Sequence, residues 1–161
     1  MAYYEFATIW RVDAPIDRVY SLIDNPADWP RWWPSVLEVR NLASPGENGV
    51  GDRYAAKMRG RLPYPLQFEA TITRREVPHA LELSATGELE GTGTWALHEE
   101  NGGTTVRYDW RVRTTAWWMN AVARLPFVDP IFRYNHHSVM RRGLAGVRRE
   151  LGVAGTYERL D

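Results

Sequence analysis

The sequence predicts an α+β fold in which an antiparallel sheet wraps over one long C-terminal helix. Alternation of apolar and polar residues with period two begins at Val36 and continues for about 80 residues, as in paired strands. A helical pattern with a clear start and a clear stop then covers the range from Asp129 to Gly152. Two shorter helical patterns lie between the first predicted strand and the second.

The composition narrows the possible functions. The 161 residues fit one domain, which we expect to span 1–161, and 20 basic side chains balance 20 acidic ones. This balance gives no global field to attract nucleic acid or an anionic membrane. The absence of cysteine excludes disulfides, thiol nucleophiles and Cys-ligated metal. With no signal-type start and no run of 18 apolar residues, we expect a cytoplasmic monomer or homodimer without stable membrane insertion.

The N-terminal part begins with a strand over Tyr3 to Val12, whose apolar face carries Thr8 and Trp10. A short amphipathic helix follows and ends before Pro26. The next run, NPADWPRWWPS, places three tryptophans at helical spacing between prolines. It predicts a second short helix with an aromatic face.

The middle of the chain predicts a meander, because short connections pair neighbouring strands antiparallel. With the first strand, the sheet would have seven strands. The six that follow are expected over Val36 to Leu42, Asp52 to Arg59, Leu66 to Glu76, Ala80 to Glu88, Glu90 to Glu100 and Thr104 to Thr114.

Parity assigns the two faces of this sheet. Large apolar side chains share one face, which must be covered, and the C-terminal helix is the only predicted element long enough to cover it. Charged side chains share the other face, which we expect to meet water. The strand arginines all fall on this outward face: Arg59, Arg107, Arg111 and Arg113.

The long helix has recognisable ends. Asp129 is a good N-cap before Pro130, and Gly152 suits a left-handed C-terminal cap. At 100° per residue His137 falls on the exposed side. The predicted buried stripe contains Phe132, His136, Val139, Met140, Gly143, Val147 and Leu151.

Two residues of this stripe are unusual for a packing helix. Gly143 costs up to about 1 kcal/mol relative to alanine, and His136 places an imidazole among apolar neighbours. Gly143 either allows close approach to the sheet or leaves volume for a ligand. His136 is either a satisfied core histidine or a polar contact for that ligand.

The segment from Ala116 to Leu125 predicts a short helix stopped by Pro126. Trp117 and Trp118 are adjacent on it and would face about 100° apart, so we expect one ring to be exposed. The segment either closes the open end of the sheet or acts as a gate.

The order of these elements resembles the helix-grip fold. On the runs VDAPIDRVYSLIDNPADWPRWWPSV and NHHSVMRRGLAGVRREL, the chain resembles the START-like (SRPBCC) superfamily, in its polyketide cyclase/dehydrase branch. The resemblance covers nearly the whole chain and implies a cavity between sheet and helix. Members of this superfamily include lipid carriers and aromatase/cyclases, so the resemblance leaves the activity open.

Catalytic motifs give little support to an enzyme. No GxSxG, HExxH, P-loop or dinucleotide fingerprint is present. His136 and His137 point about 100° apart and have no ligand one turn away, so we expect no metal and no cofactor. The resemblance implies that cyclases place an arginine inside the cavity, and the outward parity of the strand arginines departs from this.

The sequence therefore favours binding, for transport or sensing, of a small hydrophobic or aromatic molecule. A polyketide cyclase/dehydratase-type enzyme using the same cavity is the alternative, and a protein-interaction module is a third possibility. We expect a cavity of roughly a few hundred Å³. Its expected ligand-binding residues are Thr8, Trp10, Tyr54, Met58, Phe68, Trp95, Tyr108, Trp110, Asn135, His136, Met140 and Gly143.

Overall fold

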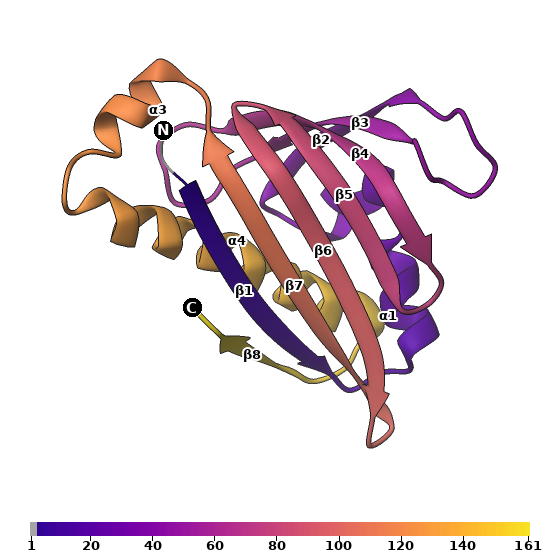
Figure 1. Cartoon of the computed structure of the whole chain (residues 1–161). Coiled ribbons are helices and arrows are strands. Elements are labelled where there is room, and N and C mark those ends of the chain that lie inside the picture. The colour runs from indigo at the N-terminus through magenta and orange to yellow at the C-terminus, as the bar shows by residue number, and fades with distance from the viewer. Residues whose placement is uncertain (1–2) are drawn as a thin grey trace.

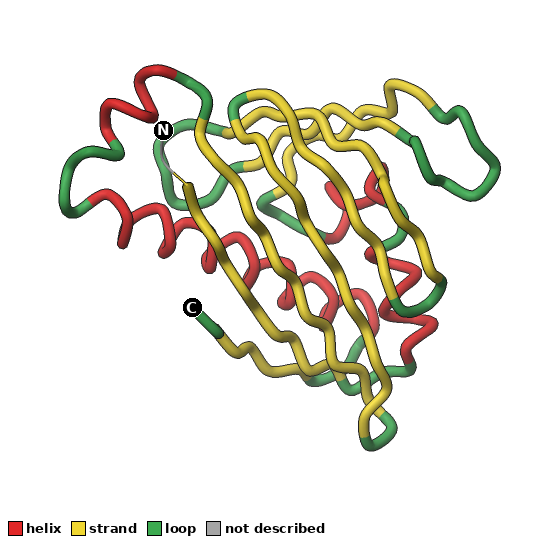
Figure 2. Tube along the Cα trace, viewed as in Figure 1, coloured by secondary structure: helices red, strands yellow, loops and turns green. Residues whose placement is uncertain are grey.

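A computed structural model describes residues 3–161 and contains one antiparallel sheet curved around a long helix (Figures 1 and 2). The eight strands follow the order β2-β3-β4-β5-β6-β7-β1-β8. Their bounds are β1 Tyr3–Val12, β2 Val36–Ala43, β3 Arg53–Met58, β4 Leu66–Glu76, β5 Ala80–Gly87, β6 Leu89–Glu100, β7 Gly103–Thr114 and β8 Gly155–Arg159.

The helices lie at the ends and on the inner face of this sheet. Figure 1 shows α1 at one end of the sheet, α3 at the other and α4 along the inner face. The bounds are α1 Ile16–Ile23, the 3₁₀ turn η1 Pro26–Asp28, α2 Trp29–Trp32, α3 Trp117–Val122 and α4 Val128–Leu151. This arrangement confirms the predicted α+β, helix-grip fold.

The strand count is the main correction to the predicted sheet. Strand β8 is an eighth strand that pairs antiparallel with β1, where Thr8 lies opposite Arg159 and Trp10 opposite Tyr157. The segment GTYER has five residues and little apolar alternation, so it carries no strand signal of its own. Its place is determined by pairing with the edge that β1 would otherwise leave open.

Strand β8 also corrects the predicted orientation of His137. This side chain is fully buried, although helical periodicity places it opposite the main stripe. Its ring hydrogen-bonds with the hydroxyl of Tyr157 and, over 2.7 Å, with a carboxylate oxygen of Asp161. Helix α4 therefore has a second covered side, next to β8.

The ends of α4 agree with the prediction at one terminus only. Gly152 adopts the left-handed conformation with φ 66°, and its N–H donates to the carbonyl of Arg148. At the other end the helix begins at Val128, and the N-cap residue Phe127 makes no side-chain capping hydrogen bond. Asp129 instead lies in the first turn, where it pairs with Arg133 at 3.0 Å.

Helix α4 approaches the tryptophan-rich turn of α2 closely. A Cβ on Gly146 would lie 1.9 Å from the carbonyl oxygen of Trp32, and a Cβ on Gly143 would lie 2.8 Å from the indole of Trp33. Gly146 therefore has no room for a side chain against this backbone atom, and Gly143 has room for one only if an indole ring shifts. Within residues 3–161, no helix is long and apolar enough to cross a membrane.

Candidate functional site

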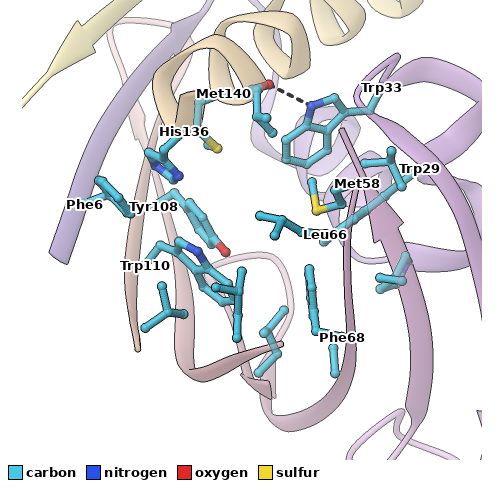
Figure 3. Close-up of a pocket in the computed structure, with 18 of the residues that line it drawn as sticks. Phe6, Trp29, Trp33, Met58, Leu66, Phe68, Tyr108, Trp110, His136 and Met140 are labelled. Atoms are coloured by element: carbon cyan, nitrogen blue, oxygen red, sulfur yellow. Dashed lines mark hydrogen bonds between the residues drawn. The ribbon is translucent and has the colours of Figure 1, made fainter. Parts of the chain in front are cut away.

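A cavity of about 110 Å³ lies between the inner face of the sheet and α4 (Figure 3). It is smaller than the few hundred Å³ expected, because indole rings occupy much of the space at one end. Trp33 lies 5.4 Å from Trp29 and 6.2 Å from Trp95, measured between ring centroids. All three rings border the cavity.

Aromatic rings of β6 and β7 form one wall. Tyr108 packs against Trp95 with ring centroids 4.2 Å apart and continues to Trp110 at 6.1 Å. These rings lie over Gly93, where a Cβ would be 2.8 Å from the tyrosine hydroxyl. Alternation along β7 turns both aromatic side chains of that strand toward the helix.

Flexible and apolar side chains from β3 and β4 form the opposite wall. Figure 3 shows Met58 and Leu66 across the cavity from Tyr108 and Trp110. The ring of Phe68 continues this wall and approaches Trp110, with ring centroids 5.9 Å apart. All three are only partly buried, and methionine adapts readily to the shape of a neighbour. This wall is the one that is able to yield to a larger occupant.

Helix α4 closes the cavity and is fixed to the tryptophan turn. The indole N–H of Trp33 donates to the carbonyl of Val139 over 2.9 Å, the bond drawn in Figure 3. Met140 lies beside this bond and is buried. The bond positions α4 over the sheet, and with the helix it positions the imidazole of His136.

The imidazole of His136 is one of two central polar groups in the cavity lining. It stacks on the ring of Phe6, with ring centroids 4.1 Å apart and an interplanar angle of 12°. Its Nε2 atom is buried and has no hydrogen-bond partner within residues 3–161. Burial lowers the pKa of His136 well below its ordinary value, and the nearby His137 and Arg133 lower that pKa further. The ring is therefore neutral at physiological pH.

The hydroxyl of Tyr108 is the other central polar group. Burial raises the pKa of Tyr108, and the carboxylate of Asp109 raises it further. The phenol stays protonated and is available as a neutral donor or acceptor. Tyr54 lies nearer the edge, where its hydroxyl donates to a carboxylate oxygen of Asp52 over 3.4 Å.

Asn135 borders the cavity but serves mainly to hold a loop. Its side-chain oxygen accepts hydrogen bonds from the backbone N–H groups of Arg61 at 2.6 Å and Leu62 at 3.1 Å. A Cβ on Gly60 would lie 2.2 Å from this oxygen. The connection between β3 and β4 is thus fixed to α4.

The same connection meets α3 at the end of the cavity. Tyr64 packs edge-on against Trp118, with ring centroids 4.7 Å apart. Trp117 is 81% exposed, which confirms that one of the two adjacent rings faces solvent. Met119, which follows them, is fully buried and borders the cavity.

The structure brings together nine of the twelve residues predicted for the site. These border the cavity: Tyr54, Met58, Phe68, Trp95, Tyr108, Trp110, Asn135, His136 and Met140. Thr8, Trp10 and Gly143 do not border it. Trp10 packs under Gly143, whose Cβ would lie 3.0 Å from that indole, so the glycine serves close packing and leaves no ligand volume.

Sequence reasoning did not select several residues of the lining. Phe6 shares its strand face with Thr8 and Trp10, so its parity was available as a signal. Trp29 and Trp33 stand in the most distinctive run of the sequence, but nothing local showed that this run reaches the cavity. Phe132 was predicted to be buried without being assigned to the site.

The lining has no ionic character. Across the described residues 3–161, no Asp, Glu, Lys or Arg borders the cavity. The strand arginines Arg59, Arg107, Arg111 and Arg113 are all exposed, as parity predicted. Two of them pair on the outer face, Arg107 with Asp109 and Arg113 with Glu90.

Solved structures with the same fold are numerous. The di-domain ARO/CYC BexL from the BE-7585A biosynthetic pathway has a TM-score of 0.73 and 21% identity, over 91% of this chain and 49% of BexL. A protein of Thermus thermophilus also has a TM-score of 0.73, with 17% identity over 91% of this chain and 99% of that one. The Zhui aromatase/cyclase from Streptomyces sp. R1128 has a TM-score of 0.72, with 11% identity over 93% and 96%. This chain thus spans about half the length of BexL.

No curated protein matches the sequence. The profile of one protein family does match, over residues 6–152. This range contains all the helices, most of β1 and the whole of β2 to β7, and it ends before β8. Its description is polyketide cyclase/dehydrase and lipid transport. The chain therefore belongs to the polyketide cyclase/dehydrase and lipid transport family.

Proposed function

We propose that this chain binds a small, uncharged hydrophobic or aromatic molecule between sheet and helix, as a carrier or sensor. The observation that carries the proposal is the composition of the cavity wall, which is built of aromatic and aliphatic side chains. None of the charged side chains of residues 3–161 borders the cavity. Apolar ligand sites combine such walls with a few polar contacts. His136 and Tyr108 are neutral polar groups of this kind.

A cyclase or dehydratase acting on a polyketide-like chain is the second candidate. The family description and the aromatase/cyclase names of two similar structures favour it. His136 and Tyr108 would then be the groups able to move a proton inside the cavity. The outward strand arginines weigh against it, because no arginine of residues 3–161 borders the cavity, where a guanidinium could steer an anionic intermediate.

One experiment separates the two candidates. The protein is purified from its own host, examined by native mass spectrometry, and any bound molecule is released and identified. We expect an uncharged aromatic or hydrophobic molecule that is recovered unchanged after prolonged incubation with fresh protein. Conversion of that molecule, for example with loss of water, would establish the enzyme instead. If the purified protein carries no bound molecule and takes up no apolar fluorescent probe, both candidate functions would be contradicted.

A further inference from the structure

Two nitrogen atoms of the cavity lining lack the partners that buried polar groups normally have. They are Nε2 of His136 and Nε1 of Trp95, which are buried with no hydrogen-bond partner in the described part of the chain. Buried polar side chains are hydrogen-bonded in the large majority of cases. An occupant of the cavity that offers an oxygen atom would satisfy such groups.

We propose that the ligand is an uncharged hydroxyarene, a single aromatic ring with a hydroxyl group that hydrogen-bonds with His136. This inference rests on the proposed function and names the chemical class of its ligand. Figure 3 shows the imidazole at the edge of the cavity, beside Tyr108 and Phe6. The ligand ring would lie among the aromatic walls, with its oxygen toward the helix.

The state of His136 determines which polar group suits it. The neutral imidazole has one nitrogen that donates and one that accepts, so Nε2 takes either role according to the tautomer. A hydroxyl group complements both roles, whereas an ether or a ketone complements only a donor. Nearby positive groups, Arg133 and Arg159, also oppose protonation of the ring, so a carboxylate would find no imidazolium to pair with.

The walls and the volume determine the rest of the ligand. Trp95, Tyr108 and Trp110 present ring faces and edges, which favour an aromatic partner. An apolar cavity of about 150 Å³ engineered into another protein binds benzene. The cavity of about 110 Å³ in this protein therefore suits one ring, with the wall of Met58 and Leu66 able to yield.

Three matched probes test this inference by calorimetric titration at neutral pH. Para-cresol and para-xylene differ by a hydroxyl in place of a methyl of nearly the same size, and 4-methylbenzoate adds a charge. We expect the wild-type protein to bind cresol and xylene but not the benzoate. Replacing His136 with leucine should reduce the preference for cresol over xylene roughly two- to tenfold, the range for one net hydrogen bond.

Two further variants serve as controls. Met140→Leu changes an apolar neighbour on the same helix and should change both affinities by the same factor. His136→Gln keeps a donor and an acceptor and should recover part of the preference for cresol. If His136→Leu does not fold, the test is made on the wild-type protein with 4-methylanisole, which is para-cresol methylated on its oxygen. We expect the wild type to bind 4-methylanisole more weakly than para-cresol.

The outcomes separate the inference from the function on which it rests. An unchanged preference in His136→Leu, or wild-type binding of the anisole as tight as that of cresol, would overturn the hydroxyarene assignment while leaving an apolar binding site. Tight binding of the benzoate would overturn the uncharged class. Failure of every probe, together with failure of an apolar fluorescent dye, would overturn the proposed function itself.

Discussion

Replacing Gly146 with alanine should destabilise the protein, although alanine is the better helix former. The new Cβ would lie 1.9 Å from the carbonyl oxygen of Trp32, a backbone atom that no side-chain rotation can move. Helix propensity favours alanine by about 1 kcal/mol. Overpacking typically costs about 1–3 kcal/mol, and a backbone clash belongs at the upper end of that range. We expect a net loss of about 1–2 kcal/mol in the free energy of unfolding, or roughly 2–8 °C in Tm.

The assay is urea denaturation followed by circular dichroism, with two comparison variants. Ala145→Gly alters the exposed neighbour and should cost about 1 kcal/mol through propensity alone. Gly143→Ala meets indole side chains, which are able to shift, and should be less harmful than Gly146→Ala. A Gly146→Ala protein as stable as the wild type would refute the close contact between α4 and the turn of α2.

Three further predictions concern pH, the entrance and metals. Burial lowers the pKa of both His136 and His137, so below about pH 6.5 the unfolded chain binds protons that the folded chain does not. The free energy of unfolding should therefore fall as pH drops through that value, and a pH-independent denaturation midpoint between about pH 7.5 and about pH 5.5 would contradict this. Trp118→Ala removes the contact with Tyr64 and should speed ligand exchange several-fold in stopped-flow fluorescence. Trp117→Ala alters an exposed ring and should leave the exchange rate unchanged. Equal exchange rates in the two variants would exclude an entrance between α3 and the β3–β4 connection. Chelator treatment should leave the Tm unchanged, and a clear drop would reveal a metal site.

Most of the fold could be predicted because its strongest signals are local. Alternation predicted β1 and β4 at their observed bounds, since polar and apolar residues there exchange at most steps. Strand β8 could not be predicted in this way, because a five-residue segment pairs only when β1 offers it an edge. The same pairing decides the burial of His137, so helical periodicity alone was wrong about that side chain.

The sequence could predict which side chains face the helix, but not which of them border the cavity. Parity selected Tyr108 and Trp110, because every inward residue of β7 must point toward the helix. Trp10 and Trp95 have the same inward parity and are equally buried, yet only the second borders the cavity. The difference arises from where α4 approaches the sheet, and that is determined by Gly143 and the tryptophan turn acting across the fold.

The clustering of tryptophans gives the molecule an internal optical reporter. Trp10, Trp29, Trp33 and Trp95 form a chain of neighbouring rings whose centroids are 5.4 to 6.2 Å apart. At such separations excitation energy passes readily between indoles, and asymmetrically coupled rings give strong near-ultraviolet circular dichroism. Trp29, Trp33 and Trp95 border the cavity, so an absorbing occupant would also quench the emission of Trp10, a ring that it does not touch. Trp117, standing in solvent, would keep its own longer-wavelength emission as an internal reference.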